Sequence, residues 1–366
     1  MTEADDRFSV TMCAKGKTMK SRTAVVKDEI YLQHLTGDYH PENHHRLEVV
    51  YEMLIDEDME GKFSILSPRP ATREELTLNH SSDYIDQVSS TAGRSFSMLD
   101  PDTTTSPKSW EAAQMAVGGV LVAVDKVVGG ESANAFALVR PPGHHAESNR
   151  GMGFCLFNNV AVAAHYARAH YSLDRIVIVD WDLHHGNGTQ NSFYKDPHVL
   201  YFSTHQSPYY PGSGSIDEYG EGKGKGYTVN VPLPGGQGDQ DFGEIFREIL
   251  KPIVSEYNPQ LILVSAGYDI YCQDPLGAMN VTPEGFAALT SLIMDMAQSF
   301  CQGKVVVTLE GGYHLNGLRD SVKATLRELS GDSILTSAQG EGKKLSSTEK
   351  IIAKVRERHK DFWSSL

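Results

Sequence analysis

Residues 175–189, "RIVIVDWDLHHGNGT", begin as an apolar run and end in two aspartates, two adjacent histidines and a Gly-Asn-Gly turn. A continuous run of isoleucine and valine is typical of a strand that is buried on both faces of a parallel sheet. In such sheets, ligands bind just outside the carboxyl ends of the strands. The stretch therefore predicts a buried strand that carries polar chemistry to one edge of a sheet.

Comparable runs recur along the rest of the chain. From about residue 135 onward, short β-branched segments alternate with longer amphipathic segments, which predicts βαβ units around a mostly parallel sheet. The expected strands end at Arg140, Asp180, Thr204, Leu233, Asp269 and Gly312. The expected helices occupy residues 158–171, 241–257, 282–300 and 316–329, with N-caps at Asp241 and Thr282.

The first 130 residues carry weaker patterns. Residues 23–32 resemble an edge strand and residues 44–56 and 109–128 resemble helices, so this part is expected to complete the same sheet. No repeat and no Pro- or Ser-rich linker divides the sequence, which predicts a single domain over residues 1–366. Residues 337–347 are expected to be flexible and to lead into a charged helical extension over about 345–366.

The composition excludes several classes of protein. With 33 Lys and Arg against 47 Asp and Glu, the net charge of -14 argues against nucleic-acid binding and favours cationic partners. The four cysteines show no C-x-x-C spacing, which indicates a reducing compartment without disulfides. Neither a secretion signal nor an apolar run of about 18 residues is present, so no membrane association and a cytoplasmic location are expected.

Polar clusters follow four of the expected strands: "VRPPGHHAE", "DWDLHHGNG", "SAGYD" and "LEGGYH". Asp182, His184 and Asp269 offer two carboxylates and one imidazole, a donor set that suits Zn²⁺ or Fe²⁺. Three protein ligands leave an open coordination position, which is typical of a catalytic metal site. The alternative for Asp269 is a simple helix or turn cap.

A histidine pair and a tyrosine could serve as catalytic groups beside such a metal. His144 and His145 follow a stiff Pro-Pro-Gly turn, and Asp180 and Asn187 are available to orient them. Tyr313 follows two glycines and could donate a hydrogen bond to a developing oxyanion. The alternatives are two surface histidines in a proline turn and a tyrosine that packs at the rim.

Together, the motifs "RPPGHHAESNRGMGFCLFNN", "VDWDLHHGNGTQ", "YPGSG", "SAGYD" and "LEGGYHL" resemble the zinc-dependent histone deacetylases. The likeness is greatest to the class II type and the bacterial histone-deacetylase-like amidohydrolases, and it covers about residues 29–330. It implies the arginase/deacetylase fold, a single three-layer α/β domain with a mostly parallel sheet of about eight strands flanked by helices.

The resemblance also implies roles for individual residues. Asp182, His184 and Asp269 would bind one catalytic zinc ion, and the catalytic residues would be His144, His145, Tyr313, Asp180 and Asn187. Because Asn187 stands where class I members carry aspartate, we expect His145 to stay neutral near pH 7. His185 is left without a catalytic role and is expected to be structural.

Structural potassium and a substrate channel are implied as well. The first potassium site would use Asp180, Asp182, His184, Ser203 and Thr204, and the second would use Phe193, Asp196, Val199 and Tyr227. The channel for the acyl-lysine would be formed by Gly153, Phe154, Tyr210 and Leu276, with Asp102, or alternatively Asp100, at its rim.

The implied activity is hydrolysis of the amide of an N-ε-acyl-lysine in a protein or peptide. Polyamine-selective members carry a glutamate where this chain has Leu276, so acyl-lysine is favoured over a cationic acylated small molecule. The alternatives are an acetylpolyamine amidohydrolase and an inactive acyl-lysine-binding scaffold. A binuclear manganese ureohydrolase fits less well, because the second strand lacks the third acid of a D-x-H-x-D motif.

Overall fold

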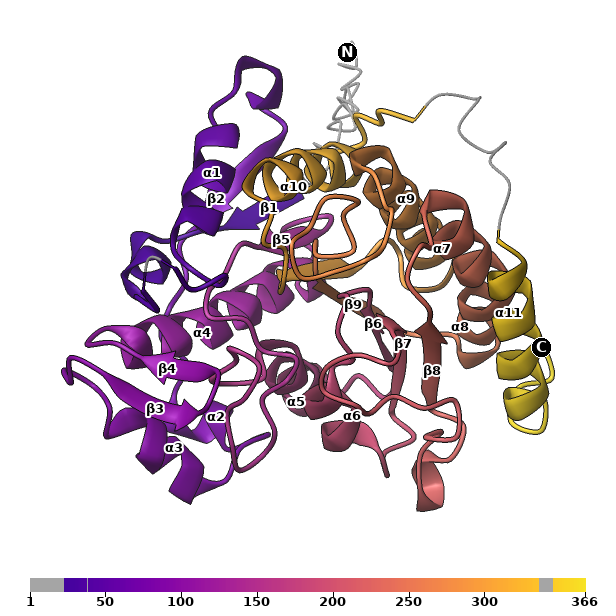
Figure 1. Ribbon diagram of the computed structural model, residues 1–366, viewed down its shortest axis with the longest axis horizontal. Coiled ribbons are helices and arrows are strands. Elements are labelled where there is room, and N and C mark those ends of the chain that lie inside the picture. Colours follow the sequence, from indigo (N-terminus) through magenta and orange to yellow (C-terminus); the bar gives the residue numbers. More distant parts are fainter. Residues whose placement is uncertain (1–22, 38, 336–344) are drawn as a thin grey trace, which may run out of the picture.

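Eight parallel strands form the centre of the computed structural model, which describes residues 23–37, 39–335 and 345–366 (Figure 1). In spatial order the strands are β2 (Phe63–Leu66), β1 (Thr23–Val26), β5 (Ala135–Ala137), β10 (Val305–Leu309), β9 (Leu261–Ala266), β6 (Ile176–Asp180), β7 (Val199–Gln206) and β8 (Thr228–Leu233). A separate antiparallel pair, β3 (Ser97–Asp100) and β4 (Thr103–Thr105), lies outside this sheet. The predicted α/β class with about eight mostly parallel strands is confirmed.

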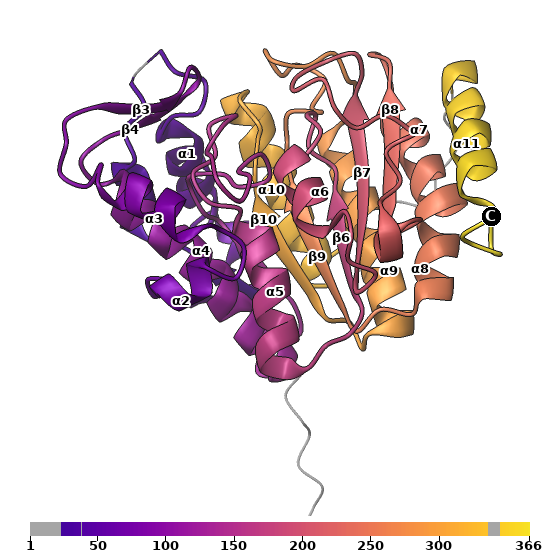
Figure 2. The same ribbon diagram turned by 90° about the horizontal axis from the view of Figure 1, so that it is seen from below.

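Helices cover both faces of the sheet, which produces the three predicted layers (Figures 1 and 2). On one face lie α4 (Ser109–Val128), α5 (Asn159–Tyr171) and α6 (Asn187–Phe193). On the other lie α1 (His45–Met53), α7 (Asp239–Ile245), α8 (Lys251–Tyr257), α9 (Pro283–Phe300) and α10 (Leu315–Leu329). The short helix α2 (Arg73–Leu76) contacts α5, and the short helix α3 (Ser82–Ser89) follows it in the chain.

The central strands are buried along their whole length, which explains their unbroken Ile and Val runs. Their register brings the carboxyl ends to one level, because Asp180 at the end of β6 pairs with Ser203 of β7 and with Ser265 of β9. Side chains that follow β6, β9 and β10 therefore meet at one edge of the sheet.

The C-terminal helix α11 (Ser346–His359) packs beside the outer strand β8 (Figure 1). It buries Ile352 and Val355, and the indole N–H of Trp363 donates to the carbonyl of Gly226 at 2.9 Å. The predicted helical extension is thus docked on the domain. Of the segment that was expected to be flexible, residues 337–347, the part up to residue 344 lies outside the described residues, and Ser346 and Ser347 begin α11.

Two local predictions were wrong. Residues 23–32 do not form an edge strand: β1 pairs with β5 and β2 on its two sides, and the chain then enters a 3₁₀ turn over Glu29–Gln33. The strand at this edge of the sheet is β2. It is short and its side chains are partly exposed, so sequence periodicity does not reveal it. Asp241 is not an N-cap, because α7 already begins at Asp239 and the Asp241 carboxylate accepts the Gly238 N–H from inside the first turn.

Other helix and strand ends follow the predictions more closely. Thr282 is the N-cap of α9 and accepts the N–H of Gly285 at 3.2 Å, with Pro283 at the first helical position. The helix expected over 241–257 is interrupted by a π turn, Phe246–Leu250, next to Pro252, which has no N–H for the regular helical ladder. Strands β9 and β10 each end three residues early, because the following residues turn away to line the site.

Candidate active site

Asp182, His184 and Asp269 meet beyond the adjacent carboxyl ends of β6 and β9. Each residue offers one ligand atom, and these three atoms lie within 4.8 Å of one another. All three residues are buried. The Nδ1 atom of His184 is 3.2 Å from Asp182 Oδ1 and 3.1 Å from Asp269 Oδ2. The structure therefore brings together the three predicted metal ligands.

The chemistry of this cluster fits a bound divalent cation. The buried Oδ2 atom of Asp269 lies 3.1 Å from His184 Nδ1 but accepts no well-formed hydrogen bond within the described chain, which is costly for an ionised group. Burial raises the pKa of Asp269, and the negative charge of Asp182 raises it further. Burial alone would lower the pKa of His184, but the two adjacent aspartates outweigh it and raise the pKa to about 9. Excess negative charge of this kind is what a metal ion compensates.

Two glycines let the backbone approach the aspartates closely. A Cβ atom on Gly267 would lie 2.1 Å from Asp182 Oδ2, and one on Gly311 would lie 2.4 Å from Asp269 Oδ2. The N–H of Gly311 donates to Asp182 Oδ2 at 2.9 Å. Larger residues at either position would displace the carboxylates.

The histidine pair is buried beside this cluster, with its two ring centroids 4.0 Å apart. His144 Nδ1 lies 3.1 Å from Asp180 Oδ2, and His145 Nδ1 lies 2.8 Å from Asn187 Oδ1. Burial would lower the pKa of His144, but the charges of Asp182 and Asp180 raise it to about 10. Burial, followed by the positive charge of His144, lowers the pKa of His145 well below its ordinary value. The two imidazoles are thus set for different protonation states.

Sequence reasoning missed Glu310, which holds the histidine turn. Its carboxylate accepts the N–H groups of Gly143 and His144 at 2.6 and 3.2 Å, and the hydroxyl of Ser265 at 3.0 Å. The signal was present as the acid of "LEGGYH", directly after an apolar strand. This carboxylate ties the turn of the histidine pair to the ends of β9 and β10.

Two further residues that hold Tyr313 were also missed. The Arg46 guanidinium lies 5.0 Å from the centroid of the Tyr313 ring, and its Nε donates to the Gly312 carbonyl at 2.6 Å. The Asp274 carboxylate accepts the N–H of Tyr313 at 2.7 Å. Arg46 and Asp274 are far from Tyr313 in the sequence, so no local motif reveals these contacts.

A cavity of about 360 Å³ lies beside the histidine pair, His184 and Tyr313. It is lined by Asp102, Pro142, His144, His145, Gly153, Phe154, Cys155, His184, Tyr209, Tyr210, Leu276, Gly311 and Tyr313. The lining includes all five predicted substrate residues, and Tyr209 had not been predicted. Aromatic walls above a polar base suit a long apolar chain that ends in a polar group.

The rim aspartate supports the channel wall. Asp102 Oδ1 accepts the N–H of Gly153 at 2.9 Å, and Thr103 Oγ1 accepts that of Phe154 at 3.0 Å. Gly153 and Phe154 have φ angles of 58° and 69°, a left-handed conformation that is unusual for phenylalanine. Asp102 faces the cavity and Asp100 is not part of its lining, so the geometry favours the Asp102 register.

The residues of the two predicted potassium sites lie at different levels along β7, the first set at Ser203 and Thr204 and the second near Val199, where the strand begins. Ser203 and Thr204 are buried, next to Asp180 in the sheet. Of the second group, the carbonyls of Phe193 and Tyr227 already accept backbone N–H groups, from Asp196 and Tyr201 respectively. Val199 begins β7. Both potassium sites stay predictions.

His185 points away from the metal cluster. Its Nδ1 lies 2.7 Å from Ser213 Oγ and its Nε2 lies 3.0 Å from Gln190 Oε1. Its ring also lies 4.8 Å from that of His205. The residue connects neighbouring loops behind the cavity, as expected for a structural histidine.

Comparison with known proteins identifies the family. The model of the "Histone deacetylase domain" matches residues 40–329. The chain belongs to the histone deacetylase family. This result confirms the family that the motifs predicted, and the histone deacetylase relatives agree with the class II type.

Three relatives illustrate the range of this histone deacetylase family. A "Probable deacetylase" of Archaeoglobus fulgidus is 39% identical over 81% of this chain and 82% of its own length. "Polyamine deacetylase HDAC10" of Danio rerio is 40% identical over 88% of this chain, which spans about half of that protein (49%). The crystal structure of the HDA15 HD domain is 38% identical, with a TM-score of 0.88, and the match covers 94% of this chain and 96% of that one. The arginase/deacetylase fold is thereby confirmed.

One further finding concerns membranes. Among the helices that the structure describes, none combines the length and the apolar character needed to cross a bilayer.

Proposed function

We propose that this histone deacetylase family member is a zinc-dependent amidohydrolase that removes the acyl group from N-ε-acyl-lysine. The observation that carries the proposal is a cavity whose lining includes His145, Tyr313 and the metal-cluster residue His184 together with aromatic walls. Asp182, His184 and Asp269 would hold the zinc ion, which when bound supplies Lewis-acid catalysis of amide hydrolysis.

His145 is placed to act as the general base. The amide nitrogen of Asn187 donates to Glu147 Oε1 at 3.0 Å, so its oxygen faces His145 and accepts the Nδ1–H of the ring. This leaves the lone pair on Nε2 free to take a proton from the attacking water. Burial and the neighbouring charge of His144 lower the pKa of His145, which favours the neutral form that a base needs.

His144 and Tyr313 would act on charge that develops during the reaction. The charges of Asp182 and Asp180 favour the cationic form of His144, and this positive charge would help to stabilise the negative transition state. Burial raises the pKa of Tyr313 well above its ordinary value, so its hydroxyl stays protonated and can donate to the oxyanion. The protonated His145 would then give its proton to the leaving amine.

The channel mouth favours acyl-lysine over polyamine. Leu276 lies in the cavity wall, and the Tyr209 hydroxyl holds its carbonyl at 2.6 Å. An apolar side chain at this position offers no carboxylate to a second ammonium group of a polyamine. The rival has support of its own, because the net charge is -14 and one relative is named a polyamine deacetylase.

A substrate panel tests the choice. Turnover of acetyl-lysine peptides is compared with that of acetylspermidine and acetylputrescine, in the wild type and in Leu276→Glu. We expect the wild type to prefer peptides and Leu276→Glu to gain activity on acetylpolyamines, with Leu276→Gln as the uncharged control. A strong preference of the wild type for polyamines would refute acyl-lysine as the substrate.

The remaining sequence predictions belong to the same proposal. An inactive scaffold is disfavoured, because the histidine pair and Tyr313 line one cavity together with His184 of the metal cluster. The cytoplasmic location and potassium at Asp180, Asp182, His184, Ser203 and Thr204 are proposed together with the activity.

A further inference from the structure

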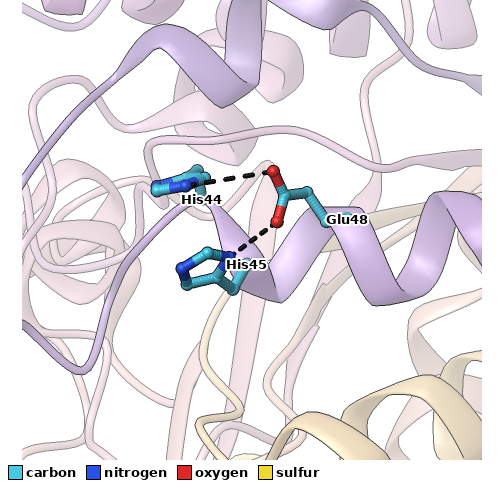
Figure 3. Close-up of side chains that lie close together, drawn as sticks. All are labelled: His44, His45 and Glu48. Carbon is cyan, nitrogen blue, oxygen red and sulfur yellow. Dashed lines mark hydrogen bonds and ion pairs between the residues drawn. The ribbon is translucent and has the colours of Figure 1, made fainter. Parts of the chain in front are cut away.

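A second group of metal-binding side chains lies at the start of α1, outside the active-site cavity. His44, His45 and Glu48 each offer one donor atom, and these atoms lie within 4.8 Å of one another (Figure 3). His45 Nδ1 is 2.6 Å from Glu48 Oε2, and His44 Nε2 is 3.9 Å from Glu48 Oε1. Figure 3 shows both imidazoles turned toward the carboxylate. We propose that this group binds a transition-metal dication, Zn²⁺ above all.

The donor types determine the class of ion. Two imidazoles and one carboxylate suit Zn²⁺ and other first-row transition metals, whereas Mg²⁺, Ca²⁺ and K⁺ prefer sites made entirely of oxygen. Ligands about 2.0–2.1 Å from a tetrahedral ion lie roughly 3.3–3.4 Å from one another. The present separations bracket that value, so small rotations of partly exposed side chains would complete the site.

The three donors have no competing task in the described chain. His44 is the N-cap of α1 but makes no side-chain capping bond, and the polar partners of the Glu48 carboxylate are His44 and His45. The exposed fractions of the His44, His45 and Glu48 side chains are 23%, 49% and 41%, so an ion can reach them from solvent. The remaining coordination positions would hold water.

The backbone that carries these donors is fixed in advance. The N–H of His45 donates to Asn43 Oδ1 at 3.0 Å, and the Asn43 amide donates to the His40 carbonyl at 2.8 Å. On the opposite side of the helix, Arg46 is buried and bonded to the Gly312 carbonyl. A fixed backbone lowers the entropy cost of binding, because only side-chain rotations remain to be ordered.

The proposed ion site is connected to the substrate channel through neighbouring residues. The ring of His40 packs against that of Phe154 at a centroid distance of 4.7 Å, and Arg46 lies over the ring of Tyr313. An ion at His44, His45 and Glu48 would brace the segment that connects these two contacts.

Zinc stoichiometry tests the site. The full chain is equilibrated with buffered free Zn²⁺ at mildly alkaline pH, and the bound zinc per chain is measured by atomic emission. We expect the wild type to bind one zinc ion more than His44→Gln/His45→Gln. The matched control is His170→Gln, which removes an exposed histidine of α5 and should keep the wild-type content. The difference is independent of whether the buried cluster is loaded and of what the enzyme hydrolyses.

A second variant guards against effects on folding. Glu48→Gln keeps a hydrogen-bonding group next to His45 but removes the charge, and we expect it to weaken the additional site at least tenfold. Visible absorption of the Co²⁺-substituted protein gives an independent readout, in which the tetrahedral signal of the second equivalent should be lost in both variants. Equal zinc content and equal cobalt spectra in the wild type and the variants would overturn the proposal.

Discussion

Two buried charged clusters of this molecule differ in how fully their polar atoms are satisfied. In the metal cluster of Asp182, His184 and Asp269, the Oδ2 atom of Asp269 accepts no well-formed hydrogen bond within the described chain. In the second, Glu42 accepts from Arg46 Nη1 at 2.9 Å and Arg140 Nη2 at 2.8 Å. Arg140 Nε also donates to the Glu42 carboxylate. Further N–H groups of the two guanidiniums donate to the backbone carbonyls of Tyr31, His34, Glu310 and Gly312.

This difference indicates how a cluster of buried charged side chains that stabilises the fold can be distinguished from one that binds a ligand. A buried cluster whose hydrogen bonds are complete stabilises the fold by itself, whereas one with an unsatisfied acceptor is completed by a ligand. The two clusters are also connected, because Arg46 touches both Glu42 and the ring of Tyr313.

The largest effect should follow from breaking the satisfied cluster. Glu42→Gln leaves two buried guanidinium groups facing a neutral amide, and we expect the free energy of unfolding to fall by about 3–5 kcal/mol. Urea denaturation followed by circular dichroism measures it. The matched control is Glu48→Gln on the exposed start of α1, which should cost at most about 1 kcal/mol. Equal losses in the two variants would contradict the distinction.

Metal should stabilise the unsatisfied cluster and leave the satisfied one unchanged. In the His44→Gln/His45→Gln background, Zn²⁺ at 1,000 times its Kd should raise the free energy of unfolding by about 4 kcal/mol. Thermal unfolding with and without a chelator provides the measurement. Asp269→Asn should abolish the response, and a response of full size in that variant would show that zinc binds elsewhere.

Tyr313→Phe tests the chemistry at the edge of the unsatisfied cluster. Loss of the hydroxyl should lower kcat by roughly 10²–10³-fold, which corresponds to about 2.7–4 kcal/mol, because an oxyanion donor is removed. Zinc content and the thermal midpoint should stay at wild-type values. Steady-state kinetics on an acetyl-lysine peptide would exclude Tyr313 from the mechanism if turnover were near normal.

The stability of the protein at acidic pH should depend on the lowered pKa of Glu42. Burial would raise its pKa, but the charge and hydrogen bonds of Arg140, with the charge of Arg46, lower it from 4.5 to about 2. A lowered pKa stabilises the fold above pH 4.5, and this contribution is lost as the pH falls from 4.5 toward 2. The loss is about 1.4 kcal/mol per pH unit at most. Urea titrations over this range should show a weaker acid dependence in Glu42→Gln than in the wild type.

Much of the fold and site was predictable because the information was local. Ile and Val runs marked the buried strands, and polar residues directly after them marked the edge where Asp182 and Asp269 meet. Thr282 and Pro283 marked a helix start for the same reason, since a cap and its partner lie within one turn.

The rest depended on contacts between distant parts of the chain. Arg46 reaches Gly312 and Arg140 reaches Glu42, and no short sequence pattern records such pairs. Glu310 was visible as a residue of a motif, but its partners Gly143 and Ser265 come from two other segments. The edge strand β2 escaped prediction because it is too short to show a period.

The docking of α11 beside β8 has a consequence for the behaviour of the protein at high concentration. An open outer strand presents backbone N–H and carbonyl groups on which another chain can add a strand. The side chains of Ile352 and Val355 pack this helix onto the domain next to β8. Removal of residues 345–366 should therefore increase self-association of the protein through this edge of the sheet.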